Sequence, residues 1–222
     1  MSAEARPTDA GLPPLVIGLT GPIGCGKSNI GRVLGELGGT VIDADVLARR
    51  ATDRGAPTLV HIRDRFGPNV FDEDGALDRG ALAAVVFGDD AALADLESIV
   101  HPEVRTLLDA ELESAASERV PFVVVEAIKL VEGGLAELCD EVWLVECSEA
   151  TQRSRLAHRG ATASDIDRRV GAQGPGLAAR LAAQLSDRPG VRRLNTEGPL
   201  EETRAKVEDA LADALENFLA ED

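Results

Sequence analysis

The sequence predicts an α/β fold in which a parallel sheet is covered by helices on both faces. Short apolar segments suited to buried strands alternate along the chain with segments of helical periodicity, which is the pattern of repeated βαβ units. A β-branched run at 122–125 is the clearest of these strands, so we expect it inside the sheet. The predicted strands cover 15–19, 40–42, 122–125, 141–145 and 191–194.

Helices are expected between these strands. Apolar residues recur at i, i+3, i+4 and i+7 from Ile30 to Leu37, and Gly38 and Gly39 end that helix. We expect further helices near 46–53, over much of 56–118 and over 149–185. Within 56–118, Pro102 is expected to interrupt one helix and begin another. A last helix is predicted from the spacing of Val207, Leu211, Leu215 and Phe218.

Composition and charge exclude several classes of protein. The chain of 222 residues carries 23 Lys and Arg against 39 Asp and Glu, a net charge of −16. Such a surface repels nucleic acids and anionic membranes, so neither is an expected partner. No apolar run approaches the roughly 18 residues that would span a bilayer. Residues 1–13 are polar, lack the apolar core of a secretion signal, and are expected to form a flexible tail.

The three cysteines, Cys25, Cys139 and Cys147, are sparse and form no C-x-x-C pair. We therefore expect neither a disulfide framework nor a zinc site, and a reducing cytoplasmic location follows from that expectation.

A phosphate-binding loop is the strongest functional signal. Residues 21–28 read G-P-I-G-C-G-K-S and fit G-x-x-x-x-G-K-[ST], with the predicted strand before them and the predicted helix after them. Glycines let successive N–H groups face phosphate oxygens, and the helix N-terminus adds positive charge. Lys27 would reach the β- and γ-phosphates and the Ser28 hydroxyl would bind Mg²⁺. The nucleotide-binding residues are therefore Gly21, Ile23, Gly24, Cys25, Gly26, Lys27 and Ser28.

Among proteins with such a loop, a small-molecule kinase is favoured. The segment Asn195–Gly198 is not the base-reading N-K-x-D of a GTPase, and the strand at 123–125 ends in Glu126 and Ala127 rather than Asp-Glu. Asp43 and Asp45 follow the second strand, where one carboxylate could accept a hydroxyl proton and the other orient water on Mg²⁺. An ordinary helix cap is the alternative for such an Asp.

Arginines suited to phosphate follow later in the chain. Gln152, Arg155 and Arg159 share one face of a predicted helix, and the planar guanidinium fits phosphate oxygens. A solvated charged face explains the same spacing equally well.

Taken in order, these segments resemble the dephospho-coenzyme A kinase family over about residues 15–210. Val16–Ser28 followed by Val41–Arg49 carries the resemblance, and the order of the Asp-Ala-Asp and His-Pro signatures makes it specific. Further matches are Leu77–Arg79, Leu82, Val86–Phe87, Ile99–Pro102, Glu132–Gly133, Gln152, Arg155, Arg159, Arg169, Gln173, Asn195 and Gly198.

The resemblance implies an adenylate-kinase-like fold whose five-stranded core carries a helical substrate region and a lid. It also implies transfer of the γ-phosphate of ATP, with Mg²⁺, to the ribose 3′-hydroxyl of dephospho-CoA. The implied core is 14–55 with 119–148 and 190–222, the implied substrate region is 56–118, and the implied lid is 149–189.

The resemblance further implies roles for single residues. Asp45 is the general base and acts with Lys27 in catalysis, while Arg155 and Arg159 clamp phosphates. Segments associated with dephospho-CoA contain Asp43, Arg49, Arg79, His101, Arg105 and Glu132. A helix cap or packing residue is the alternative for His101, a turn acid for Glu132, and surface ion pairs for Arg79 and Arg105.

The sequence also departs from the family pattern. Pro22, Cys25 and Asn29 replace residues that are usual in the loop, and Glu126 stands where the family usually has Asp. Lys129 takes an apolar place in the segment that follows. A thiol at a helix N-terminus is often reactive, so one hypothesis is that Cys25 is sensitive to alkylation and shielded by ATP. A small residue that merely fills the place of Ser is the alternative.

Other functions remain open from the sequence alone. Another nucleoside or metabolite kinase of this fold is the nearest alternative, and a nucleotide-binding switch without turnover is a second. The sequence leaves the oligomeric state open.

Overall fold

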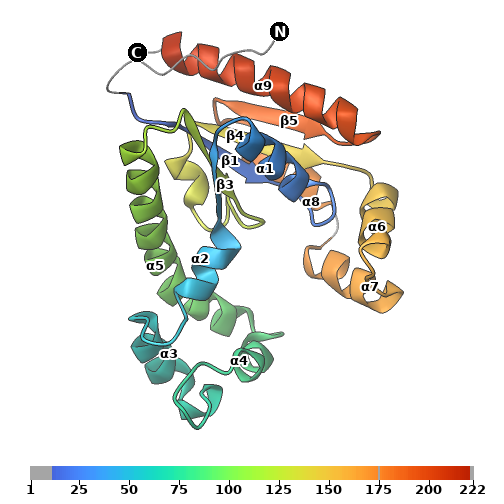
Figure 1. Ribbon diagram of the computed structural model, residues 1–222. Helices are drawn as coiled ribbons and strands as arrows, with labels where there is room; N and C mark the ends of the chain where they lie inside the picture. The colour runs from blue at the N-terminus through green and yellow to red at the C-terminus, as the bar shows by residue number, and fades with distance from the viewer. Residues whose placement is uncertain (1–11, 175, 221–222) are drawn as a thin grey trace. The chain divides into compact units, whose positions relative to one another are not determined.

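The computed structural model describes residues 12–174 and 176–220 and contains a five-stranded sheet in the order β2-β3-β1-β4-β5 (Figure 1). All five predicted strands are present, and the β1–β3, β1–β4 and β4–β5 pairs are parallel. Most of the tail expected at 1–13 lies outside the described residues. The strands are β1 Leu15–Thr20, β2 Thr40–Asp43, β3 Phe122–Glu126, β4 Glu141–Glu146 and β5 Val191–Asn195.

Helices occupy the segments between the strands, as expected from the apolar spacing. The α-helices are α1 Lys27–Glu36, α2 Ala44–Arg50, α3 Thr58–Phe66, α4 Arg79–Val86, α5 Asp90–Ser117, α6 Glu149–His158, α7 Ala163–Ala172, α8 Leu177–Gln184 and α9 Leu200–Ala220. Two short 3₁₀ helices are η1 Pro68–Val70 and η2 Leu135–Leu138. No helix in the described part of the chain is long and apolar enough to cross a bilayer.

The chain divides into two compact units. Residues 43–114 form one of them, and the described residues on either side, from 12 to 42 and from 115 onward, form the other. The sheet belongs to the latter, which we call the sheet unit. The segment 43–114, called the helical unit, enters the chain between β2 and β3 as one uninterrupted insertion.

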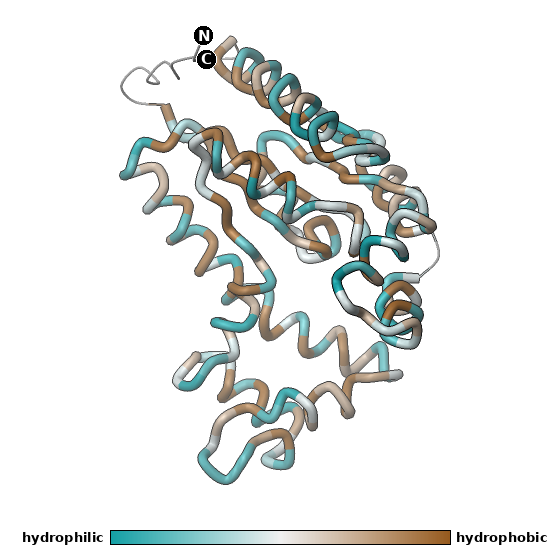
Figure 2. Tube along the Cα trace, turned by 45° about the vertical axis from the view of Figure 1, so that its right-hand side comes forward, coloured by the Kyte–Doolittle hydropathy of each residue, from teal (hydrophilic) through white to brown (hydrophobic). Residues whose placement is uncertain are grey.

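Burial in the sheet unit follows the alternation of side chains along each strand. Ile17 and Leu19 point to one face, where they join a core with residues of α1 and α9. On the other face Gly18 lies against the side chains of Leu130 and Cys139, since an added Cβ would come within 2.6 Å of the first and 2.8 Å of the second. Figure 2 shows hydrophobic residues running along the strands, whereas α9 alternates hydrophobic and hydrophilic residues.

The helical unit has its own small core. Ile62, Val70 and Leu82 are buried there against partly buried residues of α3, α4 and α5. The Asp78 carboxylate accepts hydrogen bonds from the backbone N–H groups of Gly80 and Ala81, which caps α4. Caps of this kind satisfy N–H groups that have no partner within the helix.

The expectation that Pro102 separates two helices is wrong. α5 runs without a break over Asp90–Ser117 with Pro102 inside it. Proline removes one N–H donor and crowds the preceding turn. Apolar residues on both sides of it are packed, with Ile99 against the core of the helical unit and Val104 and Leu108 buried. Packing on both sides therefore outweighs the single lost hydrogen bond.

Candidate functional site

The phosphate loop, residues 21–28, follows β1 in the sheet unit, and its last two residues begin α1, as the sequence predicts. Gly21 has a φ of 141°, and a Cβ there would lie 2.2 Å from the carbonyl oxygen of Val145 on β4. Gly26 caps α1 in the left-handed conformation with a φ of 102°. Glycine is required at both positions, by the close backbone contact at 21 and by the positive φ at 26.

Lys27 is buried, with 7% of its surface exposed, at the first position of α1. Its Nζ donates hydrogen bonds to the carbonyl oxygens of Gly21 at 2.8 Å and Pro22 at 3.3 Å. The ammonium group is therefore held across the loop, next to the positive end of the helix dipole. Two sources of positive charge meet at one place, which suits a polyphosphate anion.

Ser28 lies beside Glu126, which was not among the predicted site residues. Its hydroxyl donates a hydrogen bond of 3.1 Å to Oε1 of Glu126, the last residue of β3. The signal was present, because β3 is an apolar strand that ends in an acid and pairs with β1. Hydroxyl and carboxylate oxygens are hard ligands, and Mg²⁺ in nucleotide sites commonly uses one or two of them. The Ser28 hydroxyl and the Glu126 carboxylate together therefore fit Mg²⁺ as ligands.

One N–H group of the loop is bonded to a residue that follows α7. The backbone N–H of Ile23 donates a hydrogen bond of 3.1 Å to Oε1 of Gln173, which caps the C-terminus of α7. Gln173 matched the family pattern but was not predicted as a site residue. Its amide oxygen accepts from the loop as a phosphate oxygen would.

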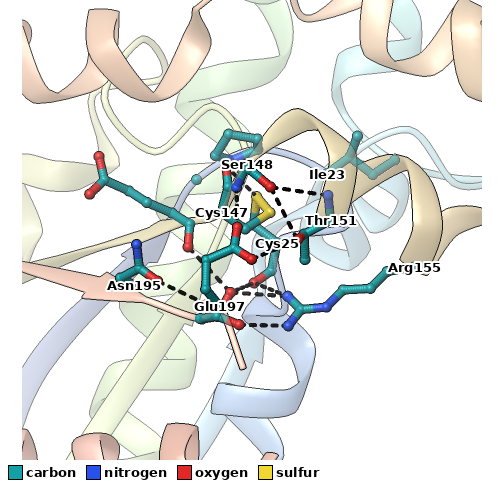
Figure 3. The surroundings of a disulfide bond; sticks show 12 residues. Ile23, Cys25, Cys147, Ser148, Thr151, Arg155, Asn195 and Glu197 are labelled. Carbon is teal, nitrogen blue, oxygen red and sulfur yellow. Dashed lines mark hydrogen bonds between the residues drawn. A yellow bond between two sulfur atoms is a disulfide. The ribbon is translucent and has the colours of Figure 1, made fainter. Parts of the chain in front are cut away.

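Cys25 and Cys147 form a disulfide with their Cα atoms 5.2 Å apart, which contradicts the expectation of free thiols (Figure 3). Neighbouring parallel strands explain the pairing, since Thr20 of β1 is in register with Leu144 of β4 and each cysteine follows shortly after its strand. The hypothesis that Cys25 is open to alkylation is therefore wrong for the bonded protein. The cytoplasmic location was predicted partly because no disulfide was expected. The disulfide removes that reason, and the location stays a prediction.

Arg155 of α6 contacts the loop directly. Its Nη1 donates to the carbonyl oxygen of Cys25 at 3.3 Å and to Oγ1 of Thr196 at 3.0 Å, and its Nη2 donates to the Thr196 carbonyl oxygen at 2.6 Å (Figure 3). Arg159 caps the C-terminus of the same helix and is exposed. The structure thus places Arg155 at the loop.

The N-terminus of α6 is fixed by an acid from the segment between β5 and α9. Glu197 accepts hydrogen bonds from the Thr151 hydroxyl at 2.6 Å and from the Ser148 backbone N–H (Figure 3). The Thr151 bond is the main reason that the pKa of Glu197 lies below its usual range, and the Ser148 bond adds to it. Glu197 was not predicted from the sequence, because its role depends on how β5 and α6 meet.

The two predicted aspartates take different positions in the helical unit. The Asp43 carboxylate accepts from the N–H groups of Asp45 at 2.8 Å and Val46 at 3.3 Å, so it is the N-cap of α2. Asp45 lies in the first turn of α2 and not on a continuation of the strand, and α2 begins at Ala44 because of this cap. Asp45 and Arg49 are exposed.

Other predicted substrate residues are spread over both units. Arg79 donates to Thr52 at 2.8 Å and pairs with Asp53 at 3.1 Å, so it joins α4 to the segment after α2. His101 and Arg105 lie on α5, in the same unit, whereas Glu132 is exposed in the sheet unit.

The helical unit also has a groove of about 440 Å³, which none of the predicted site residues lines. It lies between the start of α3 and the middle of α5. Its lining residues are Pro57, Thr58, His61, Ser98, Ile99, Pro102, Glu103 and Thr106.

The parallel sheet, the glycine loop closed by Lys27, and the Ser28–Glu126 pair together define a nucleotide-binding protein of the phosphate-loop class. Comparison with known proteins narrows this class. The family model described as dephospho-CoA kinase matches residues 15–186. The chain therefore belongs to the dephospho-CoA kinase family.

Individual relatives and solved structures are similar to this chain over most of its length. A dephospho-CoA kinase of Rhodopirellula baltica is 35% identical over 222 residues, covering 98% of this chain and 99% of the relative. The crystal structure of TT1252 from Thermus thermophilus is 33% identical, with a TM-score of 0.72, and covers 90% of this chain and 97% of its own. A dephospho-CoA kinase from Campylobacter jejuni, at 20% identity and a TM-score of 0.64, shares the fold and covers 91% of this chain and 98% of its own.

Proposed function

We propose that this protein transfers the γ-phosphate of ATP to the ribose 3′-hydroxyl of dephospho-CoA, giving coenzyme A and ADP, the last step of coenzyme A synthesis. The observation that carries the proposal is the loop at 21–28, in which Lys27 and the N-terminus of α1 gather positive charge beside the Ser28–Glu126 oxygen pair. Membership of the dephospho-CoA kinase family supplies the acceptor.

Phosphoryl transfer of this kind depends mostly on positioning and on charge neutralisation. Lys27 binds the β- and γ-phosphates, and Arg155 and Arg159 of the lid, residues 149–189, hold the transferring group. Ser28 and Glu126 hold Mg²⁺, which when bound neutralises charge on the phosphates. In this proposal a phosphate oxygen replaces the Gln173 amide oxygen as the acceptor of the hydrogen bond from the Ile23 N–H.

The acceptor is held by the helical region at 56–118 together with Asp43, Arg49 and Glu132. Asp45 accepts the proton of the 3′-hydroxyl. A carboxylate is a sufficient base here, because the proton leaves late in a loose transition state. His101, Arg79 and Arg105 belong to the same acceptor site, where Arg79 is already fixed by Thr52 and Asp53.

The proposal is tested by measuring ADP formation from MgATP with a panel of acceptors. We expect turnover that depends on dephospho-CoA, with coenzyme A as the product. AMP and shikimate serve as controls, since they are acceptors of other kinases with a phosphate loop. Turnover with either control, and none with dephospho-CoA, would overturn the proposal in favour of another metabolite kinase. Binding of ATP without turnover on any acceptor would favour a switch.

Asp45→Asn tests the proposed base. We expect kcat to fall by roughly a hundredfold or more, because the general base is lost, while the KM for ATP changes little. The matched control is Asp64→Asn, which makes the same change on an exposed residue of α3. Steady-state kinetics with ATP and dephospho-CoA measures both values. Unchanged turnover in Asp45→Asn would remove Asp45 from the mechanism.

A further inference from the structure

The disulfide joins the phosphate loop, through Cys25, to Cys147, the residue that follows β4. Cys25 is fully buried and belongs to the core formed by β1, β3, β4, β5, α1 and α9. Cys147 packs against the same core and is partly exposed. The Cys25 side chain therefore points into the core, and its bond to Cys147 attaches the loop to the end of β4.

The same bond reaches the base of α6. Cys147 directly precedes Ser148, the N-cap of α6, and the Cys25 carbonyl oxygen accepts hydrogen bonds from Thr196 Oγ1 at 2.6 Å and from Arg155 at 3.3 Å. Residue 25 is thus held through its side chain and through its carbonyl group (Figure 3). The covalent link is the one of these attachments that a change in redox conditions can open.

We propose that Cys25–Cys147 is a reversible exchange site for low-molecular-weight thiols, and that its redox state sets how tightly the phosphate loop binds nucleotide. The bonded form holds the loop in the geometry described above. In the reduced form the loop has more conformations, so nucleotide binding must supply the cost of ordering it. Reduction therefore weakens ATP binding.

The exchange proceeds in two steps that balance. A thiolate RS⁻ attacks Sγ of Cys147, which is the partly exposed residue, the S–S bond breaks, and the electron pair leaves with Sγ of Cys25. The leaving sulfur belongs to Cys25, which directly precedes Gly26, the N-cap of α1. A second RS⁻ then attacks the sulfur of R in the mixed disulfide and releases RSSR. Two thiols are oxidised, one protein disulfide is reduced, and both cysteines take up protons.

Two sources of thiol have this chemistry. One is a general cellular thiol such as glutathione, and the other is the pantetheine end of dephospho-CoA, a source that rests on the function proposed above. In the reverse direction a low-molecular-weight disulfide is the oxidant and restores the Cys25–Cys147 bond.

Exchange is tested on the full-length oxidised protein with each thiol in turn. The reaction is stopped with N-ethylmaleimide, and peptides are analysed by mass spectrometry. We expect the mixed disulfide on Cys147 and the maleimide on Cys25. A mixed disulfide on Cys147 with either thiol supports the inference and identifies the source. A mixed disulfide on Cys25, or none with both thiols, would overturn it.

Coupling to the loop is tested by calorimetric titration of ATP, without acceptor, into oxidised and reduced protein. We expect Kd to rise by about three- to tenfold on reduction, which corresponds to no more than about one decade of affinity. The double variant Cys25→Ser, Cys147→Ser should bind like the reduced protein and ignore reductant. The matched control Cys139→Ser should keep the difference, because Cys139 is a free thiol outside the pair.

Equal Kd values for the oxidised and reduced wild-type protein would overturn the coupling, and that comparison needs no variant to fold. ATP binding is measured without dephospho-CoA. A failure of the proposed acceptor therefore leaves this result unaffected, and the two failures can be told apart.

Discussion

At the scale of the residue, the hydrogen bond between Ser28 and Glu126 is the reason that we propose a part for Glu126 in holding Mg²⁺. Its carboxylate accepts from Ser28, so the end of β3 and the start of α1 share one polar contact. A glutamine at this position keeps an oxygen that can accept from the hydroxyl but loses the negative charge. The hydrogen bond and the charge can therefore be tested separately.

We predict that Glu126→Gln raises the Mg²⁺ concentration needed for half-maximal activity by roughly tenfold or more, because a charged oxygen near the ion is lost. Titration of Mg²⁺ at fixed ATP measures the effect. Glu216→Gln, on the exposed side of α9, is the matched control and should leave the titration unchanged. An unchanged Mg²⁺ requirement in Glu126→Gln would show that Glu126 has no part in holding the ion.

The free thiol of Cys139 gives a prediction for alkaline pH. Burial raises the pKa of Cys139 from 9.0 to about 12. The folded protein therefore holds this proton more tightly than the unfolded chain, so the contribution to stability is full below pH 9 and is lost as the pH rises toward 12. Between about pH 8 and about pH 10 the loss is on the order of 1 kcal/mol.

Chemical unfolding at these two pH values measures that loss. In Cys139→Ala the thiol is absent, so over the same interval the stability of the variant should fall by on the order of 1 kcal/mol less than that of the wild type. Equal pH dependence in the two proteins would contradict the assignment to this thiol.

Single residues also mark what the sequence could not predict. The glycines and Lys27 of the loop were predictable, because the loop, its strand and its helix are contiguous. Cys147 and Glu197 were not, because each is brought to the loop or to α6 by the pairing of strands far apart in the sequence. The separation of 122 residues between Cys25 and Cys147 carries no signal until β1 and β4 are known to be neighbours.

At the scale of the element, strands were more predictable than helix ends. Strands of a parallel sheet are buried on both faces and read as continuous apolar runs, as at Phe122–Val125. The course of α5 was not predictable, because the packing that carries it past Pro102 involves elements distant in sequence. Asp43 was left open between cap and catalytic residue. The structure shows it as the N-cap of α2, because it accepts from two backbone N–H groups, and its part in holding the acceptor stays a proposal.

The turn between α1 and β2 provides a test of packing between elements. Gly39 has no room for a side chain, since a Cβ would lie 2.1 Å from the ring of Phe122. We predict that Gly39→Ala costs about 1–3 kcal/mol of stability, because the ring must move within a packed core. Thermal unfolding measures the loss.

The matched control for Gly39→Ala is Gly171→Ala in α7. Among the described residues, no atom outside the two neighbouring residues and the local backbone of α7 lies within 4 Å of a Cβ added at Gly171. Alanine there should therefore be neutral or should stabilise by up to about 1 kcal/mol through its helix propensity. Equal effects of the two substitutions would show that contact with Phe122 is not the cause.

At the scale of the whole molecule, the disulfide closes a long loop of chain. The bond joins residues 122 positions apart and encloses all of the helical unit, residues 43–114. Such a link limits the conformations of the unfolded chain, and for loops of this length the stabilisation is roughly 3–5 kcal/mol.

We therefore predict that reduction lowers the midpoint of thermal unfolding by several degrees. Scanning calorimetry with and without dithiothreitol measures the difference. The double variant Cys25→Ser, Cys147→Ser should unfold at one temperature in both conditions. A wild-type midpoint that does not respond to reductant would mean that the bond adds nothing to stability.

Because the helical unit lies between the two bonded cysteines, the disulfide also determines the result of proteolysis within it. A single backbone cut anywhere between residues 43 and 114 falls inside the covalent ring that Cys25 and Cys147 close. The two fragments stay joined, so the nicked molecule migrates as one band on a denaturing gel until a reductant separates it into two. Damage to the helical unit thus leaves the ends of the chain attached to each other.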